Sequence, residues 1–133
     1  AGHEPPWLLP AGGEPPRRLP IAGGPPLCAV EGFDYRSQTL QLQPGDGLCL
    51  LTDGIGDAQN LGGEFYGQAR VAACLGRFTH GESAPFVVES LLADTLAFAE
   101  GAEQADDLTI LALRWHGAAA EAPQTVEAKT ARM

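Results

Sequence analysis

The chain has 133 residues, eight Lys and Arg against 17 Asp and Glu, and a net charge of −9. This length corresponds to one domain or part of one, and so acidic a chain lacks the cations needed to bind nucleic acid or an anionic membrane surface. No apolar run approaches the ~20 residues of a membrane span and no signal peptide is recognisable, so we expect a cytoplasmic protein.

The three cysteines, Cys28, Cys49 and Cys74, are odd in number and show no CxxC spacing. Buried free cysteines are common in protein cores. We therefore expect three reduced thiols in place of a disulfide or a metal site.

Residues 1–27 alternate clusters of Pro and Gly with short apolar segments at 7–9 and 19–21. Because Pro lacks the N–H that a strand donates, we expect only short strands interrupted by turns. The Pro-Pro doublets also suit a polyproline ligand, but they alternate with strand-like segments and form no tract.

The pattern becomes more regular from residue 27 onward. Residues 27–30 predict a strand, and residues 35–42 alternate in polarity as an exposed strand does. The sequence Gln-Pro-Gly-Asp at 43–46 predicts a type II turn. It leads into the apolar run 48–51, which predicts a strand buried on both faces.

Two helices are expected in the second half of the chain, after a short helical piece at 57–60. The first covers residues 68–78, with apolar side chains three and four residues apart. The second covers 84–100, with Ser83 as N-cap and Gly101 as C-terminal cap. A last strand is expected at 108–115, and the residues beyond it show no periodicity and predict a flexible tail or linker.

Two short acidic motifs carry most of the chemical information. Thr-Asp-Gly at 52–54 closes one apolar run, and Asp-Asp-Leu-Thr at 106–109 opens another. Either motif alone is more often a plain turn in solvent. If the two strands run antiparallel, however, Asp53 and Asp106 come to the same edge of the sheet, and paired carboxylates on rigid elements suit Mg²⁺ or Mn²⁺.

Other chemistries find little support. The histidines are too far apart for a zinc pair, with His3 interpreted as structural and His80 and His116 in loops. There is no phosphate-binding loop or nucleophile elbow. Arg70 and Arg77 lie on one face of the expected helix 68–78, and this face is either solvated or binds phosphate.

The order of the motifs nevertheless resembles a known family. The Ala-Gly-His start with Pro5-Pro6 is similar to the "NAGH-PP" segment of that family, without its Asn. The segments that follow in the same order are 24–30, 42–46, 50–54, 64–67 and 106–109. Residues 1–115 thus resemble the C-terminal half of the SpoIIE/RsbU-type branch of the PPM (PP2C-like) metal-dependent serine/threonine phosphatases, followed by a tail at 116–133.

The resemblance implies an α+β fold that is part of a four-layer α-β-β-α sandwich, with antiparallel sheets and two flanking helices. It implies two Mn²⁺ or Mg²⁺ ions in the intact domain, which activate a water for attack on phosphoserine or phosphothreonine. By motif position, Asp53 and Asp106 are metal ligands and Asp107 orients them. Thr52, Gly54 and Thr109 support the site, the threonines by hydrogen bonds to the carboxylates.

The resemblance also implies partners. The expected substrate is a phosphorylated anti-anti-sigma (STAS-type) regulator in bacterial signalling, and an upstream sensor or receiver domain is expected in the same chain. The first metal motif of the family, an Asp in a "GDVSGHG"-like stretch, does not occur here. We therefore expect this segment alone to be inactive and to associate with the missing half or with itself.

Two alternatives stay open. One is a phosphatase-like module without catalysis that binds a partner protein. The other, based on Pro-Gly-Asp at 44–46 and the short strands, is a jelly-roll or cupin-like ligand binder. The absence of paired histidines and the long helix at 84–100 count against the second.

Overall fold

The computed structural model describes residues 2–21, 23–78, 81–104, 106–117 and 126–131, and for the last of these ranges the backbone alone. Ala1 and His80, for which the sequence carries expectations, lie outside the described residues. Among the described helices, none is long and apolar enough to cross a membrane.

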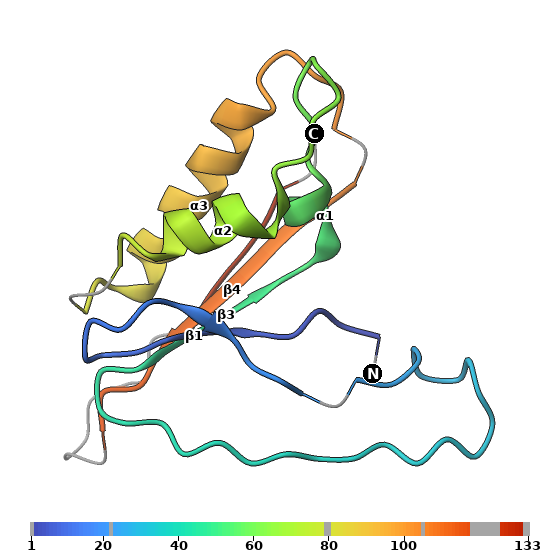
Figure 1. Ribbon diagram of the computed structural model, residues 1–133, viewed down its shortest axis with the longest axis vertical. Helices are drawn as coiled ribbons and strands as arrows, with labels where there is room; N and C mark the ends of the chain where they lie inside the picture. The colour runs from blue at the N-terminus through green and yellow to red at the C-terminus, as the bar shows by residue number, and fades with distance from the viewer. Residues whose placement is uncertain (1, 22, 79–80, 105, 118–125, 132–133) are drawn as a thin grey trace.

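One antiparallel sheet of five strands, in the spatial order β2-β1-β3-β4-β5, organises the chain (Figure 1). The strands are β1 (Trp7–Leu9), β2 (Arg17–Arg18), β3 (Gly47–Leu51), β4 (Leu108–Arg114) and β5 (Val126–Ala131). The apolar runs 48–51 and 108–113 thus form the centre of the sheet, as their composition predicts. The strand expected at 19–21 is instead the two-residue β2, because its Pro20 cannot donate to a ladder.

Three helices complete the fold: α1 (Asp53–Asp57), α2 (Gly67–Leu75) and α3 (Ala84–Phe98). The start of α3 is confirmed, since the Ser83 hydroxyl accepts a hydrogen bond from the Phe86 N–H at 3.4 Å. Gly101 has a positive φ of 83° just beyond the helix, the conformation expected of a C-terminal glycine. The short helix expected at 57–60 begins instead at Asp53, directly after the strand.

Helices α2 and α3 cover one face of the sheet and form a single core with it (Figure 1). The expected apolar stripes of both helices supply buried side chains, and so does every second residue of β3 and β4. The core includes Trp7, Cys49, Leu51, Val71, Cys74, Leu75, Phe78, Val88, Leu91, Leu108 and Ile110.

The opposite face of the sheet is only half-buried. Leu48 pairs with Leu113, and Leu50 pairs with Leu111, and all four side chains are partly exposed on this face. The expectation that the run 48–51 is buried on both faces is therefore wrong for the described residues, where helices cover one face alone (Figure 1).

Residues 27–46 differ most from expectation. The strand predicted at 27–30 is a turn, in which Cys28 has a positive φ of 65°, and residues 35–42 are extended and mostly exposed without forming a ladder. The polar alternation at 35–42 fits a strand only if a partner strand lies beside it, and no described segment pairs with it. The turn at 43–46 is confirmed, with Gly45 at a φ of 92° and the Asp46 N–H donating to the Gln43 carbonyl at 2.9 Å.

The tail also departs from expectation. In the stretch after residue 116, predicted to lack regular structure, residues 126–131 form β5 and pair with the whole of β4 up to Leu113. Without β5, β4 would be an edge strand with unpaired N–H and C=O groups, and backbone pairing of this kind makes few demands on the sequence of the added strand. The fold class is α+β, as the resemblance implied, with one sheet and one layer of helices in the described residues.

Candidate metal centre

The two acidic motifs lie side by side at one edge of the sheet. Strand β3 ends at Leu51, which pairs with Ile110 near the start of β4, so the two strands run antiparallel. The Thr52 N–H donates to the Thr109 carbonyl at 3.1 Å and extends this pairing by one step. Asp53 follows immediately on one strand and Asp106 and Asp107 precede the other, so the backbones of the two acidic motifs meet at this edge.

Gly54 allows the two motifs to approach closely. A Cβ on Gly54 would lie closer than 3.0 Å to the carbonyl oxygen of Asp107 and 3.2 Å from its carbonyl carbon. Real Cβ atoms essentially never come within 3.0 Å of such an atom. The glycine of the Thr-Asp-Gly motif is thus needed for its lack of a side chain, and its backbone is not in the left-handed region.

The hydroxyl of Thr52 joins the backbones of the two motifs. It donates to the Asp107 carbonyl oxygen at 3.3 Å and accepts from the Thr109 N–H at 3.1 Å. The sequence predicts that Thr52 and Thr109 support the carboxylates; the hydrogen bonds shown for Thr52 go to backbone atoms and hold the acidic segments in register. A role of Thr109 toward a carboxylate stays a prediction.

The carboxylates of the two predicted ligands, Asp53 and Asp106, each accept a hydrogen bond from the backbone N–H of the following residue. Asp53 accepts from the Gly54 N–H at 3.0 Å, and Asp106 accepts from the Asp107 N–H at 2.7 Å. Asp53 and Asp106 are exposed and Asp107 is half-buried. Each predicted ligand therefore keeps lone pairs for a cation, since a carboxylate has about four acceptor positions.

The donor chemistry suits a hard divalent cation, but the number of donors does not complete a site. Carboxylate oxygens are the ligands that Mg²⁺ and Mn²⁺ prefer. Among the described residues, however, no three or more His, Cys, Asp or Glu side chains group closely enough to hold an ion. Asp53, Asp106 and Asp107 could thus hold one only together with oxygens from elsewhere.

The start of the chain forms the other wall of the centre. A cavity of about 110 Å³ is lined by Gly2, His3, Glu4, Thr52 and Asp53. Trp7 pairs with Cys49 in the sheet, and this register carries residues 3 and 4 alongside 52 and 53. The sequence pattern does not predict this position of His3, because only strand pairing, which one sequence does not reveal, brings it there.

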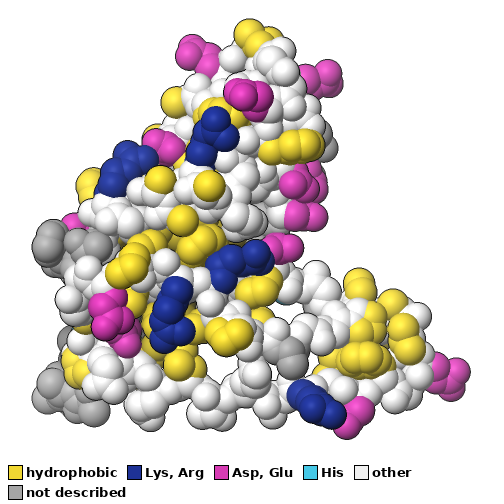
Figure 2. All heavy atoms as spheres, in the orientation of Figure 1, with side chains coloured by type: hydrophobic (Ala, Val, Ile, Leu, Met, Phe, Trp, Pro, Cys, Tyr) yellow, Lys and Arg dark blue, Asp and Glu magenta, His cyan; other side chains and the backbone are white. Residues whose placement is uncertain are grey.

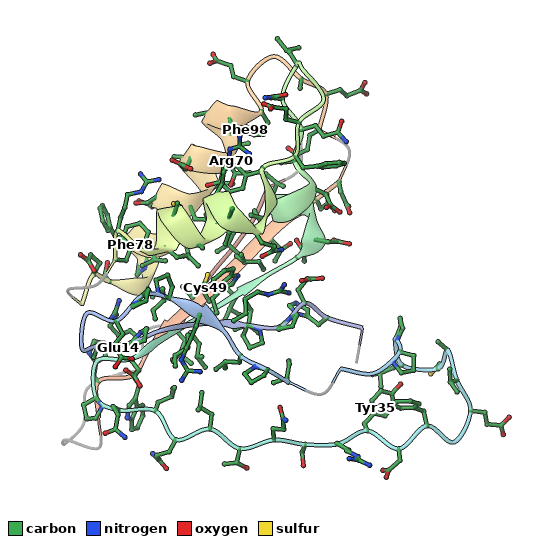
Figure 3. The ribbon with its side chains drawn as sticks, in the orientation of Figure 1. Glu14, Tyr35, Cys49, Arg70, Phe78 and Phe98 are labelled. Carbon is green, nitrogen blue, oxygen red and sulfur yellow. The ribbon has the colours of Figure 1, made fainter. Side chains whose placement is uncertain are left out.

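Arg70 and Arg77 do not face the centre. Arg77 binds the Asp94 carboxylate at 2.7 Å, and Arg70 lies over the Phe98 ring with its guanidinium carbon 4.5 Å from the ring centroid (Figure 3). Arg70 thus links α2 to α3, and Arg77, which lies just after α2 because the helix ends at Leu75 and not at residue 78, links the following turn to α3. Neither of these contacts is to a phosphate-like group.

The hydroxyl of the buried Tyr66 side chain forms a further contact with α3. The Tyr66 phenol donates to the Asp94 carboxylate at 2.5 Å. Burial, followed by this hydrogen bond, raises the pKa of Tyr66, whereas the hydrogen bonds from Tyr66 and Arg77 lower the pKa of Asp94. Tyr66 is therefore a neutral donor and Asp94 a charged acceptor at neutral pH.

The cysteines are free thiols. Cys28 is exposed, whereas Cys49 and Cys74 are buried. Burial, with the nearby Cys74, raises the pKa of Cys49 to about 12. Burial also raises the pKa of Cys74. The two buried thiols are thus unreactive core residues, because the thiolate is the nucleophilic form.

Comparison with known proteins gives one match. A sequence model of the family described as Stage II sporulation protein E (SpoIIE) matches residues 1–116, which include both acidic motifs and every helix. No curated protein and no solved structure matches the chain.

Proposed function

This chain belongs to the SpoIIE family, and on that basis we propose that it forms part of a metal-dependent phosphatase domain acting on phosphoserine or phosphothreonine in a protein. Members of the family are typically metal-dependent phosphatases of the PPM type. The observation that carries the proposal is the meeting of Asp53 with Asp106 and Asp107 at the end of the β3–β4 pair.

In the proposed site, Asp53 and Asp106 bind Mn²⁺ or Mg²⁺, and Asp107 orients them. Bound divalent ions supply a nucleophilic water at neutral pH and neutralise charge on the phosphoryl group. This chain holds the backbones of the two acidic segments in register, through the Thr52 hydroxyl and the close approach at Gly54. Such rigidity matters because catalysis depends on placement to within about 1 Å.

The proposal extends to the layers of the fold and to the substrate. The half-exposed leucines on the second face of the sheet are suited to pack against a second sheet, which supports a four-layer α-β-β-α sandwich in the intact domain. We place the protein in bacterial signalling, with a phosphorylated anti-anti-sigma (STAS-type) protein as its substrate and a sensor or receiver domain upstream.

The test is hydrolysis of p-nitrophenyl phosphate by the longest native chain that contains these residues, with and without Mn²⁺. Loss of an outer-shell partner costs about 10- to 100-fold in metal affinity or activity, so we expect the Asp53→Asn variant to lose at least that much. Asp57→Asn is the matched control, because Asp57 is an exposed carboxylate on the same helix α1.

Calorimetric titration with Mn²⁺ gives a second readout that does not depend on turnover. Binding that Asp53→Asn weakens and Asp57→Asn leaves intact supports the assignment of Asp53. Equal Mn²⁺ affinities and equal activities in the three proteins would show that Asp53 is no ligand.

A second candidate function is a phosphatase-like module that binds a partner protein without catalysis. The shortage of metal donors among the described residues favours it. A folded protein that binds neither Mn²⁺ nor p-nitrophenyl phosphate would identify this candidate as the correct one.

A further inference from the structure

A short hairpin next to the candidate metal centre displays two large apolar side chains to solvent. The hairpin covers residues 59–65 and is closed by the bridge between Gln59 and Phe65. Leu61 is 77% exposed, more than any other large apolar side chain among the described residues, and Phe65 is 54% exposed. Exposed apolar groups gathered in one place mark interaction sites more often than single ones do.

The hairpin is held in one conformation by its own hydrogen bonds. The Asn60 carboxamide oxygen accepts from the N–H groups of Gly62 and Glu64 at 2.9 and 3.0 Å, and its NH₂ donates to the Glu64 carboxylate at 2.9 Å. At the base, the Tyr66 N–H donates to the Ala58 carbonyl at 2.7 Å. A preorganised loop loses little entropy when a partner binds, so the two apolar side chains are presented at low cost.

The helices hold the hairpin in place. Leu61 packs beside the turn after α3, where its Cδ1 atom would lie 3.1 Å from a Cβ on Gly101. Arg70 of α2 donates to the Phe65 carbonyl at 3.0 Å while its guanidinium lies over Phe98 (Figure 3). The hairpin between α1 and α2 thus lies beside the turn between α3 and β4 (Figure 1).

This position is at the same end of the sheet as the candidate metal centre (Figure 1). Helix α1 begins at Asp53 and ends at Asp57, and its five residues span about 7.5 Å at 1.5 Å per residue. A folded protein that inserts a phosphorylated side chain at Asp53 must rest on the surface around it. The hairpin follows α1 in the chain and lies at the end of the molecule where β4 starts (Figure 1).

The surface around the two apolar side chains is mainly acidic, with Arg70, which donates to the Phe65 carbonyl, as a cation beside it. Residues 52–69 and 96–113 contain seven Asp and Glu side chains and neither Lys nor Arg. Figure 2 shows several acidic side chains and fewer basic ones at this end of the molecule. A partner whose contact face is apolar and bordered by Lys and Arg would therefore be attracted, and an acidic face would be repelled.

We propose that Leu61 and Phe65 form the docking site for the folded phosphoprotein substrate, whose matching face is apolar with a basic border. The inference rests on the proposed function, since it takes the occupant to be the substrate of the neighbouring centre. In this proposal the phosphorylated residue binds at the metal centre, and the hairpin binds the protein that carries this residue. The hairpin therefore determines which phosphoprotein is bound.

The experiment compares the native chain with the double variant Leu61→Ser/Phe65→Ser, using a serine-phosphorylated STAS-type protein and p-nitrophenyl phosphate as the two substrates. We expect kcat/KM for the phosphoprotein to fall about tenfold or more, as loss of a central apolar contact does, while hydrolysis of p-nitrophenyl phosphate is unchanged. Val30→Ser is the matched control, because Val30 is 50% exposed on the distant segment 27–46.

Binding is measured separately by calorimetry in EDTA, so the docking site is tested even if the chain proves to have no phosphatase activity. A native chain inactive on p-nitrophenyl phosphate refutes the proposed function alone, and weaker binding by the double variant still supports the docking site. Equal affinities of native and double-variant chains, or no binding by the native chain, overturn the docking site. A dimer that sedimentation shows to be lost in the double variant, with phosphoprotein affinity unchanged, assigns the hairpin to a second copy and also overturns it.

Discussion

Replacement of Gly54 by Ala should separate the two acidic motifs. The added Cβ would lie inside 3.0 Å of the Asp107 carbonyl oxygen, whereas ordinary contact begins at 3.4 Å. The neighbour is backbone at the start of β4 and cannot rotate away as a side chain would. The Asp53 and Asp107 segments must therefore move apart by more than 0.4 Å.

The size of the effect follows from this overlap. Forcing an extra methyl group into a packed site typically costs about 1–3 kcal/mol, which lowers the melting temperature of a domain of this size by roughly 4–12 °C. The displacement also changes the separation of the predicted metal ligands. We expect Mn²⁺ affinity to fall by about tenfold or more, the range seen when groups that orient ligands are lost.

Gly56→Ala is the control for this prediction. Gly56 belongs to the same helix α1, and a Cβ there would meet only the end of the flexible Gln68 side chain, at 3.3 Å. Both substitutions gain helix propensity of up to about 1 kcal/mol, so the difference between them isolates the contact with Asp107. Thermal melts and Mn²⁺ titrations that give the same values for both variants would refute the reasoning.

Two further predictions concern hydrogen bonds. Thr52→Val keeps the shape of the side chain but removes the hydroxyl that joins Asp107 to Thr109, so urea unfolding should show a loss of about 1–3 kcal/mol; an unchanged midpoint would contradict it. Because the hydrogen bond from Tyr66 lowers the pKa of Asp94, the unfolded chain binds the extra proton first as pH falls. The stability that Asp94 contributes is thus complete at neutral pH and lost as pH drops below about 4. Native chain and Asp94→Asn should accordingly differ in urea midpoint at pH 7 and converge at acidic pH, and a constant gap would refute the linkage.

The sequence predicted the parts of the fold that depend on local pattern. The runs 48–51 and 108–113 and the stripes of α2 and α3 were found because a buried strand or an amphipathic helix shows its periodicity in few residues. Residues 35–42 alternate just as clearly and form no strand, because alternation does not supply a partner to pair with.

For the candidate site too, the sequence predicted the features that depend on local motifs and missed those that depend on tertiary contacts. Asp53 and Asp106 were recognisable as motifs, and their shared edge followed once the strands were taken as antiparallel. The reason for Gly54 was not visible, since it depends on a backbone atom of Asp107, which is distant in sequence. The nearness of His3 and the contacts of Arg70 and Arg77 with α3 likewise arise from tertiary contacts that no short window contains.

The bond between Thr52 and Thr109 joins residues 57 positions apart, and all of α2 and α3 lies between them. Pairing at such a separation must first overcome the entropy of closing a long loop, so contacts of this kind form slowly during folding. An unfolded chain therefore holds its two groups of carboxylates far apart and offers a cation no preformed site. Metal binding at this edge would report completed folding, and the cation would stabilise the finished domain without acting as a template for it.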